Sequence, residues 1–413
     1  MTSVKFIPVC SVSSGDFSNV KKITQIDELS WKLPYDREVS PHHSSKSSNL
    51  SLMKMETQTM YFTDPGSKLS GLIQILYSKV LGNLHKGFQV NFKVFSHDQR
   101  KNDEYQVWLS THISGMDFIK GPPTAEDGGK YYSFIGAEGK GVKVYFSEIP
   151  AREGGENSKG IKYVMDINIP KEGLSIKLES VLGEGFYIQP DGCSYFFEHP
   201  VSSVDIAKLK ESPTASRKFI RHMFIPSGKC NGIISYMNQS GTRKEITLWE
   251  APILYIDATQ TLLPSRAVSR WNFLCFKGSN YTAMVMEYLT TAEFGSVRLS
   301  LWSISKGDRI IDVGSQVNDD DIVQFIKTKM DTKNKWQYPT AVTFKFPNSS
   351  HDELIADDLH LVKAFSILDE LPTMVRQVAR KIMDMHPFLY QHCQKAKFRG
   401  EDGVAFVETT FVS

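Results

Sequence analysis

The chain has 413 residues, of which 41% are hydrophobic and 23% are charged, and its formal net charge is +2. This composition is typical of globular proteins, and at roughly 100–200 residues per domain the length predicts two domains. The small net charge creates no strong field for nucleic acid, so we expect no nucleic-acid partner. No run of about 18 apolar residues occurs, so we expect no transmembrane segment.

The five cysteines, Cys10, Cys193, Cys230, Cys275 and Cys393, are odd in number and far apart. None forms the close pairs that a disulfide framework or a zinc site uses, so we expect reduced thiols, no metal and no cofactor. The first residues also lack the long apolar run of a signal peptide. Together these features predict a cytoplasmic protein, with the nucleus as a second compartment.

Residues 1–50 are predicted to be an N-terminal arm and linker. The stretch 35–50 is rich in serine, histidine and charged residues, which is typical of a linker. Before it, Leu29, Trp31 and Leu33 are spaced so that they could hold a mostly irregular arm against the first domain.

Residues 51–217 are predicted to form the first domain. Apolar residues recur at every second position, as in Val90, Phe92 and Val94, and this period is typical of half-buried strands. Turns that contain Gly and Pro separate these runs, and GAEGKG (136–141) lacks the spacing of a phosphate-binding loop, so we expect a hairpin turn there. Such frequent strands without crossover helices predict antiparallel sheets in a barrel or a sandwich.

Residues 218–413 are predicted to form the second domain, after a connection over 201–217 that contains Pro213. Strand-like runs resume here, including RWNFLCFKG (270–278) and YTAMVMEYLTT (281–291). Both domains are therefore expected to consist mainly of strands.

One segment of the second domain has a helical pattern instead. ELPTMVRQVARKIMDMHP (370–387) carries apolar residues at intervals of three and four, which predicts an amphipathic helix near the C-terminus. The proline at its end stops the helix. A strand over GVAFVETTFVS (403–413) is expected to complete the domain.

Four blocks of the sequence resemble the fungal survival-factor family. They are SWKLP with ETQTMYFTDPGSKLSGLIQILYSKVLG (30–34 and 56–82), RHMFIPSGKCNGII (221–234), SRAVSRWNFLCFKGSNYTAMVMEYLTT (265–291) and the ending from 371 to 413. The blocks follow the family's order with matching spacing, and the resemblance covers nearly the whole chain from about residue 28. We therefore interpret the chain as a diverged paralogue in this family.

The resemblance implies a fold of two tandem lipocalin-like antiparallel β-barrels. It also implies a link to survival under oxidative stress and cold, and to sphingolipid handling in the cytosol and on secretory-pathway membranes. Related lipocalin-like proteins include carotenoid hydratases and fungal cyclases. Membrane-associated members begin with an amphipathic helix, but residues 1–16 contain Pro8 and Gly15 and no helical apolar stripe, so we do not expect peripheral membrane contact by this route.

The candidate ligand-binding residues lie on two neighbouring predicted strands. Met284, Met286 and Tyr288 share one face of one strand, and Trp271 and Phe273 share a face of the other. A small barrel can hold one ligand among its inward-facing side chains, and methionine and aromatic groups make an adaptable lining for a lipid tail. The alternative is that these residues are plain core, because small barrels are commonly filled by side chains.

Two carboxylates, Asp257 and Glu287, lie within strand-like runs. A buried carboxylate with a raised pKa could protonate an alkene or an epoxide, as a hydratase or a cyclase requires. We expect instead that both carboxylates face solvent or pair with Arg266, Arg270 or Arg298.

The histidines form no catalytic or metal-binding motif. We expect His222 to hold backbone groups and not to catalyse. The predicted function is therefore that of a non-enzymatic, lipocalin-like carrier of an apolar, sphingolipid-like ligand, linked to survival under oxidative stress. One alternative is a lipocalin-like hydratase or cyclase acting on an isoprenoid- or polyketide-like substrate. Another is a stress-response interaction module without a ligand; the oligomeric state stays open.

Overall fold

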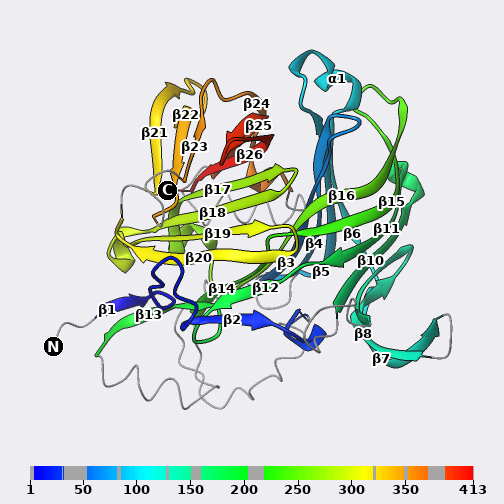
Figure 1. Cartoon of the computed structure of the whole chain (residues 1–413), viewed down its shortest axis with the longest axis horizontal. Helices are drawn as coiled ribbons and strands as arrows, with labels where there is room; N and C mark the ends of the chain where they lie inside the picture. Colours follow the sequence, from blue (N-terminus) through cyan, green and yellow to red (C-terminus); the bar gives the residue numbers. More distant parts are fainter. Residues whose placement is uncertain are drawn as a thin grey trace.

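The computed structural model describes residues 4–29, 31, 54–80, 85–126, 130–149, 160–202, 218–319, 322–347, 352–370 and 387–412. Nearly all regular structure within these residues is antiparallel strand, which confirms the predicted all-β class (Figure 1). The helices described there are short: η1 (Ile26–Leu29), η4 (Gln99–Lys101), α1 (Asn102–Tyr105), η5 (Pro170–Glu172), α3 (Pro264–Ala267), η6 (Ala292–Phe294) and η7 (Ile367–Glu370). None of them has the length and apolar character needed to cross a membrane. The amphipathic helix predicted over 370–387 falls almost wholly outside the described residues.

The first sheet follows the order β6-β5-β4-β3-β16-β15-β11-β10-β9-β8-β7 and curls strongly (Figure 1). Its strands are β3 (Lys54–Asp64), β4 (Leu69–Val80), β5 (His85–Ser96), β6 (Val107–Ile113), β7 (Asp117–Glu126), β8 (Lys130–Gly139), β9 (Val142–Ile149), β10 (Gly160–Ile169), β11 (Leu174–Leu182), β15 (Gly228–Met237) and β16 (Arg243–Gln260). The predicted hairpin turn at 136–141 is confirmed, because β8 pairs with β9 across it. The two ends of this path, β6 and β7, do not pair with each other, so the sheet is open among the described strands.

Five shorter strands extend this sheet. They are β1 (Val4–Ile7), β2 (Val20–Ile23), β12 (Gly185–Ile188), β13 (Cys193–Val201) and β14 (Lys218–Ile225). Strand β14 pairs with both β13 and β16, and β16 pairs with β3. Strands β14 to β16 thus join the sheet of the chain's first half, although they follow residue 217. The division into two domains at 217/218 stays a prediction.

The second half contains a seven-stranded sheet and a three-stranded sheet. The first has the order β20-β19-β18-β17-β26-β25-β24, with β17 (Val268–Gly278), β18 (Tyr281–Thr290), β19 (Arg298–Lys306), β20 (Arg309–Val317), β24 (Leu361–Ser366), β25 (Phe388–Phe398) and β26 (Glu401–Phe411). The second consists of β21 (Val323–Met330), β22 (Gln337–Lys345) and β23 (Glu353–Ala356). β20 and β24 do not pair, so this seven-stranded sheet is also open within the described chain.

Apolar side chains fill the interior of the first sheet. Val90, Phe92 and Val94 are fully buried there, as their period-two spacing predicts. Because the pleat sends successive side chains to opposite faces, one alternate set forms this core and the other set faces outward. The curled first sheet therefore encloses a packed core.

A second core lies between the seven-stranded and three-stranded sheets. It brings together Val285 and Trp302 from the former with Val342 and Phe344 from the latter. At Gly314 on β20, an added Cβ would lie 1.9 Å from the Trp302 ring. Only glycine leaves room for that ring against the neighbouring strand, so the packing here is tight.

A third core joins the two halves. It includes Leu254 and Ile256 of β16, together with Met284, Met286 and Tyr288 of β18. The outward face of the first sheet thus packs against one face of the seven-stranded sheet. The strands of the two sheets that meet here are therefore covered on both faces, which matters for the site described below.

The N-terminal arm packs against the core of the first sheet. Leu29 and Trp31 are fully buried there, as predicted, and the Trp31 ring meets Phe88 edge-on at 5.4 Å between ring centroids. Leu33 lies outside the described residues. The five cysteines are also as expected, since none is in a disulfide and four are buried.

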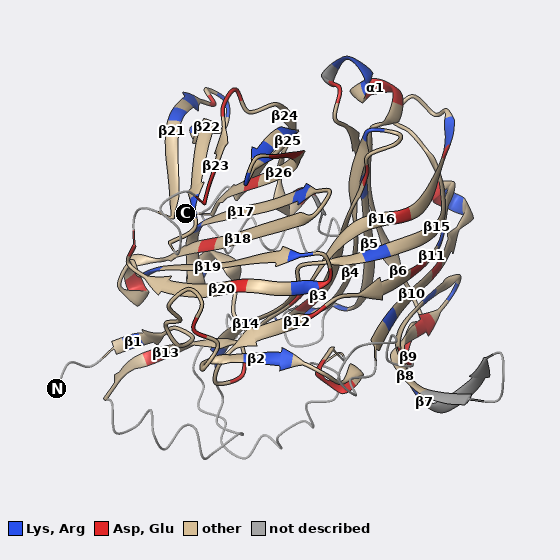
Figure 2. Cartoon of the chain, viewed as in Figure 1, with Lys and Arg blue, Asp and Glu red and all other residues tan. Residues whose placement is uncertain are grey.

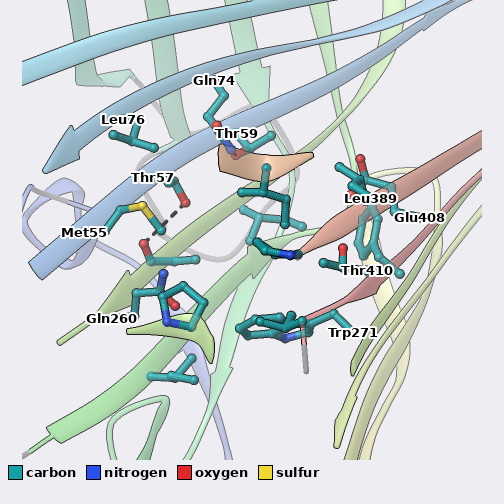
Figure 3. Close-up of a pocket in the computed structure, with 18 of the residues that line it drawn as sticks. Met55, Thr57, Thr59, Gln74, Leu76, Gln260, Trp271, Leu389, Glu408 and Thr410 are labelled. Atoms are coloured by element: carbon teal, nitrogen blue, oxygen red, sulfur yellow. Dashed lines mark hydrogen bonds between the residues drawn. The ribbon is translucent and has the colours of Figure 1, made fainter. Parts of the chain in front are cut away.

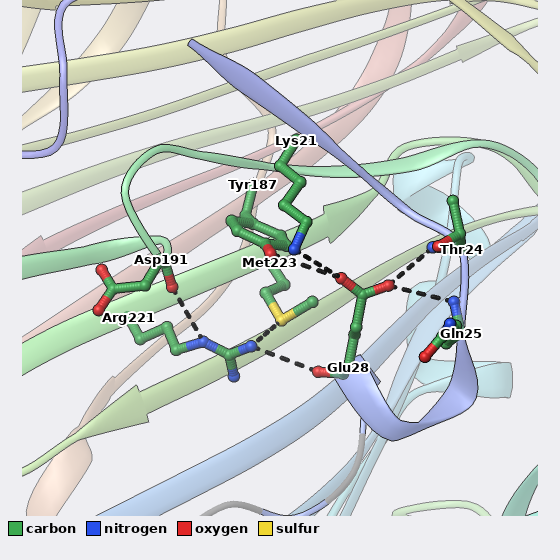
Figure 4. Close-up of polar contacts among 8 residues, drawn as sticks. All are labelled: Lys21, Thr24, Gln25, Glu28, Tyr187, Asp191, Arg221 and Met223. Carbon is green, nitrogen blue, oxygen red and sulfur yellow. Dashed lines mark hydrogen bonds and ion pairs between the residues drawn. The ribbon is translucent and has the colours of Figure 1, made fainter. Parts of the chain in front are cut away.

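Polar contacts hold the single turn η1 in place (Figure 4). The Glu28 carboxylate accepts hydrogen bonds from the main-chain N–H groups of Thr24 at 2.8 Å and Gln25 at 3.1 Å, and from the Tyr187 hydroxyl at 3.4 Å. Arg221 on β14 donates to the main-chain carbonyl of Glu28 at 3.3 Å. The Glu28 side chain thus joins the arm to β12, and the Glu28 backbone joins it to β14.

Candidate functional site

A cavity of about 370 Å³ lies between the first sheet and the seven-stranded sheet. Strands β3, β4, β14 and β16 contribute one wall, and β17, β25 and β26 contribute the other (Figure 3). The lining includes Met55, Thr57 and Leu76 from the first wall and Trp271, Leu389 and Thr410 from the second. A cavity of this size is in the range of small-molecule sites.

Strand alternation decides which residues of β3 reach the cavity. On β3, Thr57, Thr59 and Tyr61 line it, whereas Met60 between them is buried in the core of the first sheet. On β17, Trp271 and Phe273 line it, and Asn272 between them also belongs to the lining. Strand alternation therefore accounts for the lining on β3 and for only part of it on β17.

One part of the lining is a chain of amide and hydroxyl groups on the first sheet. The Gln89 amide donates to Asn91 Oδ1 at 2.7 Å and to Ser110 Oγ at 2.7 Å. Asn91 donates to Gln74 Oε1 at 2.8 Å, and Gln74 in turn donates to Thr59 Oγ1 at 2.9 Å. These residues line or support the cavity wall, and their mutual bonds hold the amides of Gln74 and Gln89 in fixed orientations.

A second polar group centres on Glu408 of β26. Its carboxylate accepts hydrogen bonds from the Gln391 amide and from the Tyr61 hydroxyl, the latter at 3.4 Å. Trp108 Nε1 donates to Gln391 Oε1 at 3.2 Å, so four residues from both sheets form one chain. Burial, and next the charge of Glu408, raise the pKa of Tyr61 well above its usual value. Tyr61 is therefore a neutral hydrogen-bond donor, and Glu408 is an acceptor directed at the cavity.

His222 of β14 is a buried member of the lining. Burial, and next the charge of Arg221, lower its pKa to about 4, so the ring is neutral at pH 7. The ring lies parallel to Phe224, with centroids 5.9 Å apart. We expected this histidine to hold backbone groups, but within the described part of the chain no hydrogen bond joins the ring to the backbone. The ring instead forms part of the cavity wall.

The described residues contain no cluster of three or more His, Cys, Asp or Glu side chains that could hold a metal. A model of the Svf1 family matches residues 4–413. The chain belongs to the Svf1 family. This confirms the resemblance noted in the sequence.

Two relatives place the chain within the Svf1 family. It is 37% identical to an uncharacterised SVF1-like protein of Saccharomyces cerevisiae, over 99% of this chain and 98% of that protein. It is 26% identical to a Candida albicans protein named ceramide-binding protein SVF1, over 87% of this chain and 85% of that protein. Among solved structures, CghA with Sch210972 has a similar fold, with a TM-score of 0.52 and 9% identity over 87% of this chain and 89% of the other. At this identity the likeness concerns the fold alone.

The structure brings the five predicted ligand-binding residues to one face, but not to the face expected. Trp271, Phe273 and Met286 line the cavity, whereas Met284 and Tyr288 are buried in the core that joins the two halves. We expected this face to line the inside of the second barrel. It is directed instead at the first sheet, because the interior of the second half is filled by the opposite face. That these five residues bind a ligand stays a prediction.

The two carboxylates singled out in the sequence are both buried, so the expectation that they face solvent is wrong. Glu287 accepts hydrogen bonds from Asn272 at 2.9 Å and Ser300 at 3.0 Å. Burial raises its pKa, although these bonds and the charges of Arg298 and Arg270 oppose the shift. Arg298 and Arg270 thus act electrostatically on Glu287, as two of the arginines that we expected near it.

Asp257 has a different partner from those expected. Its carboxylate lies 3.6 Å from a nitrogen of Arg221, which was not among the partners that we expected. Neither Asp257 nor Glu287 lines the cavity, because both side chains point to the opposite faces of their sheets. Neither carboxylate is therefore among the groups that a ligand in this cavity would contact.

Sequence reasoning missed the polar lining of this Svf1-family site. Glu408, Tyr61 and the amides of Gln74 and Gln391 lie in strands that we read only for their apolar positions. The sequence signal that could have found them is their period-two spacing. Polar residues that recur at every second position of a buried strand indicate a face that lines a polar site, because burying polar groups in an apolar core is costly.

Proposed function

We propose that this Svf1-family protein is a non-enzymatic binding or carrier protein for an apolar, sphingolipid-like ligand, held between its two sheets. The observation that carries this proposal is a cavity lined by aromatic and aliphatic groups on β17 and β18 and by oriented amide and hydroxyl groups on β3 to β5. Relatives named ceramide-binding proteins support the ligand class. We also propose lipocalin-like barrels for the two halves.

The two parts of the lining match the two parts of such a ligand. Trp271, Phe273 and Met286 offer apolar surface for a hydrocarbon chain. The amides of Gln74 and Gln89 and the carboxylate of Glu408 offer partners for hydroxyl and amide groups of the head. No lysine or arginine occurs among the described lining residues. The site therefore suits a neutral head group better than a phosphorylated one.

A binding experiment with a ceramide tests this proposal. Native mass spectrometry of the full-length protein mixed with ceramide should show a one-to-one complex, and ceramide should raise the melting temperature further as its concentration increases. A ceramide phosphate should bind more weakly, because its charge finds no cation in the described lining. Protein that shows neither a complex nor a shift with ceramide would overturn this proposal and leave the two alternatives, an enzyme for a different substrate and an interaction module without a ligand.

A cavity-filling variant locates the ligand. Ala258 on β16 lines the cavity, so Ala258→Phe should occupy the space and weaken ceramide binding at least tenfold. Thr247→Phe, at an exposed position on the same strand, is the matched control and should bind normally. Unchanged binding by Ala258→Phe would place the ligand elsewhere.

An enzymatic function is the second candidate, because acid–base groups line the same cavity. Glu408, Tyr61 and His222 could together accept and donate protons on an isoprenoid- or polyketide-like substrate. Incubation of the protein with ceramide and with a polyene, followed by mass spectrometry, separates the two candidates. A carrier returns its ligand unchanged, whereas a hydratase would add the mass of water.

We further propose that ligand binding serves survival under oxidative stress and takes place in the cytoplasm, with the nucleus as a second compartment. Both proposals rest on the resemblance to the survival-factor family. A fluorescent fusion expressed with and without peroxide, in cells lacking the gene, would test both. Restored survival by the wild type and not by Ala258→Phe would tie the phenotype to the cavity.

A further inference from the structure

The hairpin formed by β21 and β22 carries exposed apolar and basic side chains together. Ile326 and Met330 on β21 are 53% and 52% exposed. Strand β21 is an edge of the three-stranded sheet, so no other described strand pairs with its outer side. Single exposed apolar residues are ordinary, but two large ones on one short edge strand need a reason.

Four lysines flank these apolar residues. Lys327, Lys329, Lys333 and Lys335 are all exposed, and no ion pair joins any of them to another residue of the described chain. Figure 2 shows basic residues in blue on β21. The only acidic residue between Val323 and Gln337 is Asp331. The hairpin therefore presents a positive local charge on a chain whose net charge is only +2.

Asp331 is turned inward and fixes the turn. Its carboxylate accepts hydrogen bonds from the Tyr390 hydroxyl at 2.8 Å, from Asn334 Nδ2 at 2.7 Å and from the main-chain N–H of Lys333 at 3.0 Å. Its main-chain N–H donates to the Trp336 carbonyl at 2.8 Å. The carboxylate is thus engaged with the protein, and the lysines remain the charges that the turn shows to the outside.

The hairpin is attached to the strands of the cavity wall. Tyr338 stacks on Tyr390 of β25 at 4.6 Å, and Trp336 stacks on Phe411 of β26 at 5.0 Å between ring centroids. Leu389 precedes Tyr390 and Thr410 precedes Phe411, and both line the cavity from the opposite face of the same strands. The exposed hairpin and the cavity therefore share one wall.

We propose that the β21–β22 hairpin docks on the surface of an anionic lipid bilayer. Aliphatic side chains that enter the interface, together with lysines that meet anionic head groups, are the combination that peripheral membrane segments use. Lysines on an edge strand also prevent sheets from pairing edge to edge. That role accounts for Lys327 and Lys329, but exposed Ile326 and Met330 would work against it. This surface is separate from the N-terminal segment, and its docking does not depend on a ligand in the cavity.

Vesicle flotation of the full-length protein tests the proposal. Vesicles of phosphatidylcholine mixed with phosphatidylserine should carry the protein, and pure phosphatidylcholine vesicles should not. Lys327→Gln with Lys329→Gln should weaken binding about fivefold for each lysine removed, and added salt should weaken binding of the wild type. Ile326→Ser with Met330→Ser should weaken binding at least tenfold. Because all four positions are exposed, the variants should keep the wild-type melting temperature.

A matched pair on the first sheet provides the control. Lys177 and Ile233 are exposed cross-strand neighbours on β11 and β15, so Lys177→Gln with Ile233→Ser makes one substitution of each kind elsewhere. This control should bind vesicles like the wild type. Equal losses of vesicle binding in the control and the hairpin variants would overturn the proposal. So would a wild-type protein whose binding does not increase when phosphatidylserine is added to the vesicles.

A fluorescent label reports which surface touches the bilayer. An environment-sensitive dye on Thr332→Cys, in the hairpin turn, should brighten with anionic vesicles, whereas the dye on Ser240→Cys, in the β15–β16 turn, should not. Brightening at 240 alone would contradict the proposed orientation. Dimer formation through the hairpin would also overturn the proposal. It would be seen as a wild-type dimer in sedimentation that is lost in Ile326→Ser with Met330→Ser, together with no binding of the wild type to vesicles.

Discussion

Lys277 of the seven-stranded sheet donates a hydrogen bond from its amine to the main-chain carbonyl of Pro226 at 2.7 Å, in the connection between β14 and β15 of the first sheet. The same amine donates to the carbonyl of Ile253 at 2.5 Å. Lys277 is buried, and this burial lowers its pKa to about 8. One side chain thus joins the two sheets that form the cavity walls.

Lys277 should make stability depend on pH in the alkaline range. Because its pKa falls from about 10.5 in the unfolded chain to about 8 in the folded chain, raising the pH between these values favours folding. Urea unfolding of the wild type and of Lys277→Met at several pH values measures this effect. The stability of the wild type relative to the variant should rise by about 2 kcal/mol between pH 8 and pH 10. The difference in unfolding free energy between the two proteins removes the contributions of the buried tyrosines and cysteines, because both proteins contain them. A difference that does not change with pH would contradict the prediction.

His222 should make stability depend on pH in the acidic range. Burial lowers its folded-state pKa to about 4, whereas the unfolded value is near 6.5. As the pH falls from 6.5 to 4, the unfolded chain gains a proton that the folded chain does not, so folding loses up to about 3 kcal/mol. His222→Gln should lose correspondingly less over this range in urea unfolding. Parallel pH profiles of the wild type and the variant would show that His222 titrates alike in both states.

Local structure followed from the sequence because the period of a strand is fixed by its pleat. Val90, Phe92 and Val94 are buried on one face, and Met284 and Met286 lie together on another, as predicted. Which sheet the face with Met284 and Met286 packs against could not be predicted in the same way. Both sides of β18 are covered, so alternation no longer distinguishes an inside from an outside.

The polar half of the cavity depends on contacts between distant parts of the chain. Tyr61 and Glu408 are 347 positions apart, and they meet only because the outer faces of two sheets are packed together. Apolar periodicity marks where each strand is buried but does not say which strand lies opposite it. Glu408 therefore looked like one polar residue in a closing strand, and its role required the arrangement of the sheets.

Glu408 should contribute to affinity for a ligand with hydroxyl or amide donors. Glu408→Gln keeps the shape and removes the charge, and charge-assisted hydrogen bonds are about twice as strong as neutral ones. We expect ceramide binding to weaken about tenfold, measured by titration of a fluorescent ceramide. Glu401→Gln, the same change outside the cavity on the same strand, should have no effect on affinity. Equal affinities of Glu408→Gln and the wild type would show that the ligand does not reach the carboxylate.

Trp31 should be essential to stability although it lies in an arm that contributes little regular structure. Its side chain is buried against Phe88 in the core of the first sheet, so Trp31→Ala leaves a large cavity there and should cost about 3–5 kcal/mol in urea unfolding. Trp249→Ala is the matched control, because Trp249 is 82% exposed and its loss should change stability by about 0.5 kcal/mol or less. Trp31 packs in the inner core of the first sheet and does not line the inter-sheet cavity, so folded Trp31→Ala should still bind ceramide normally. Equal and small losses in the two variants would mean that the arm is not packed as described.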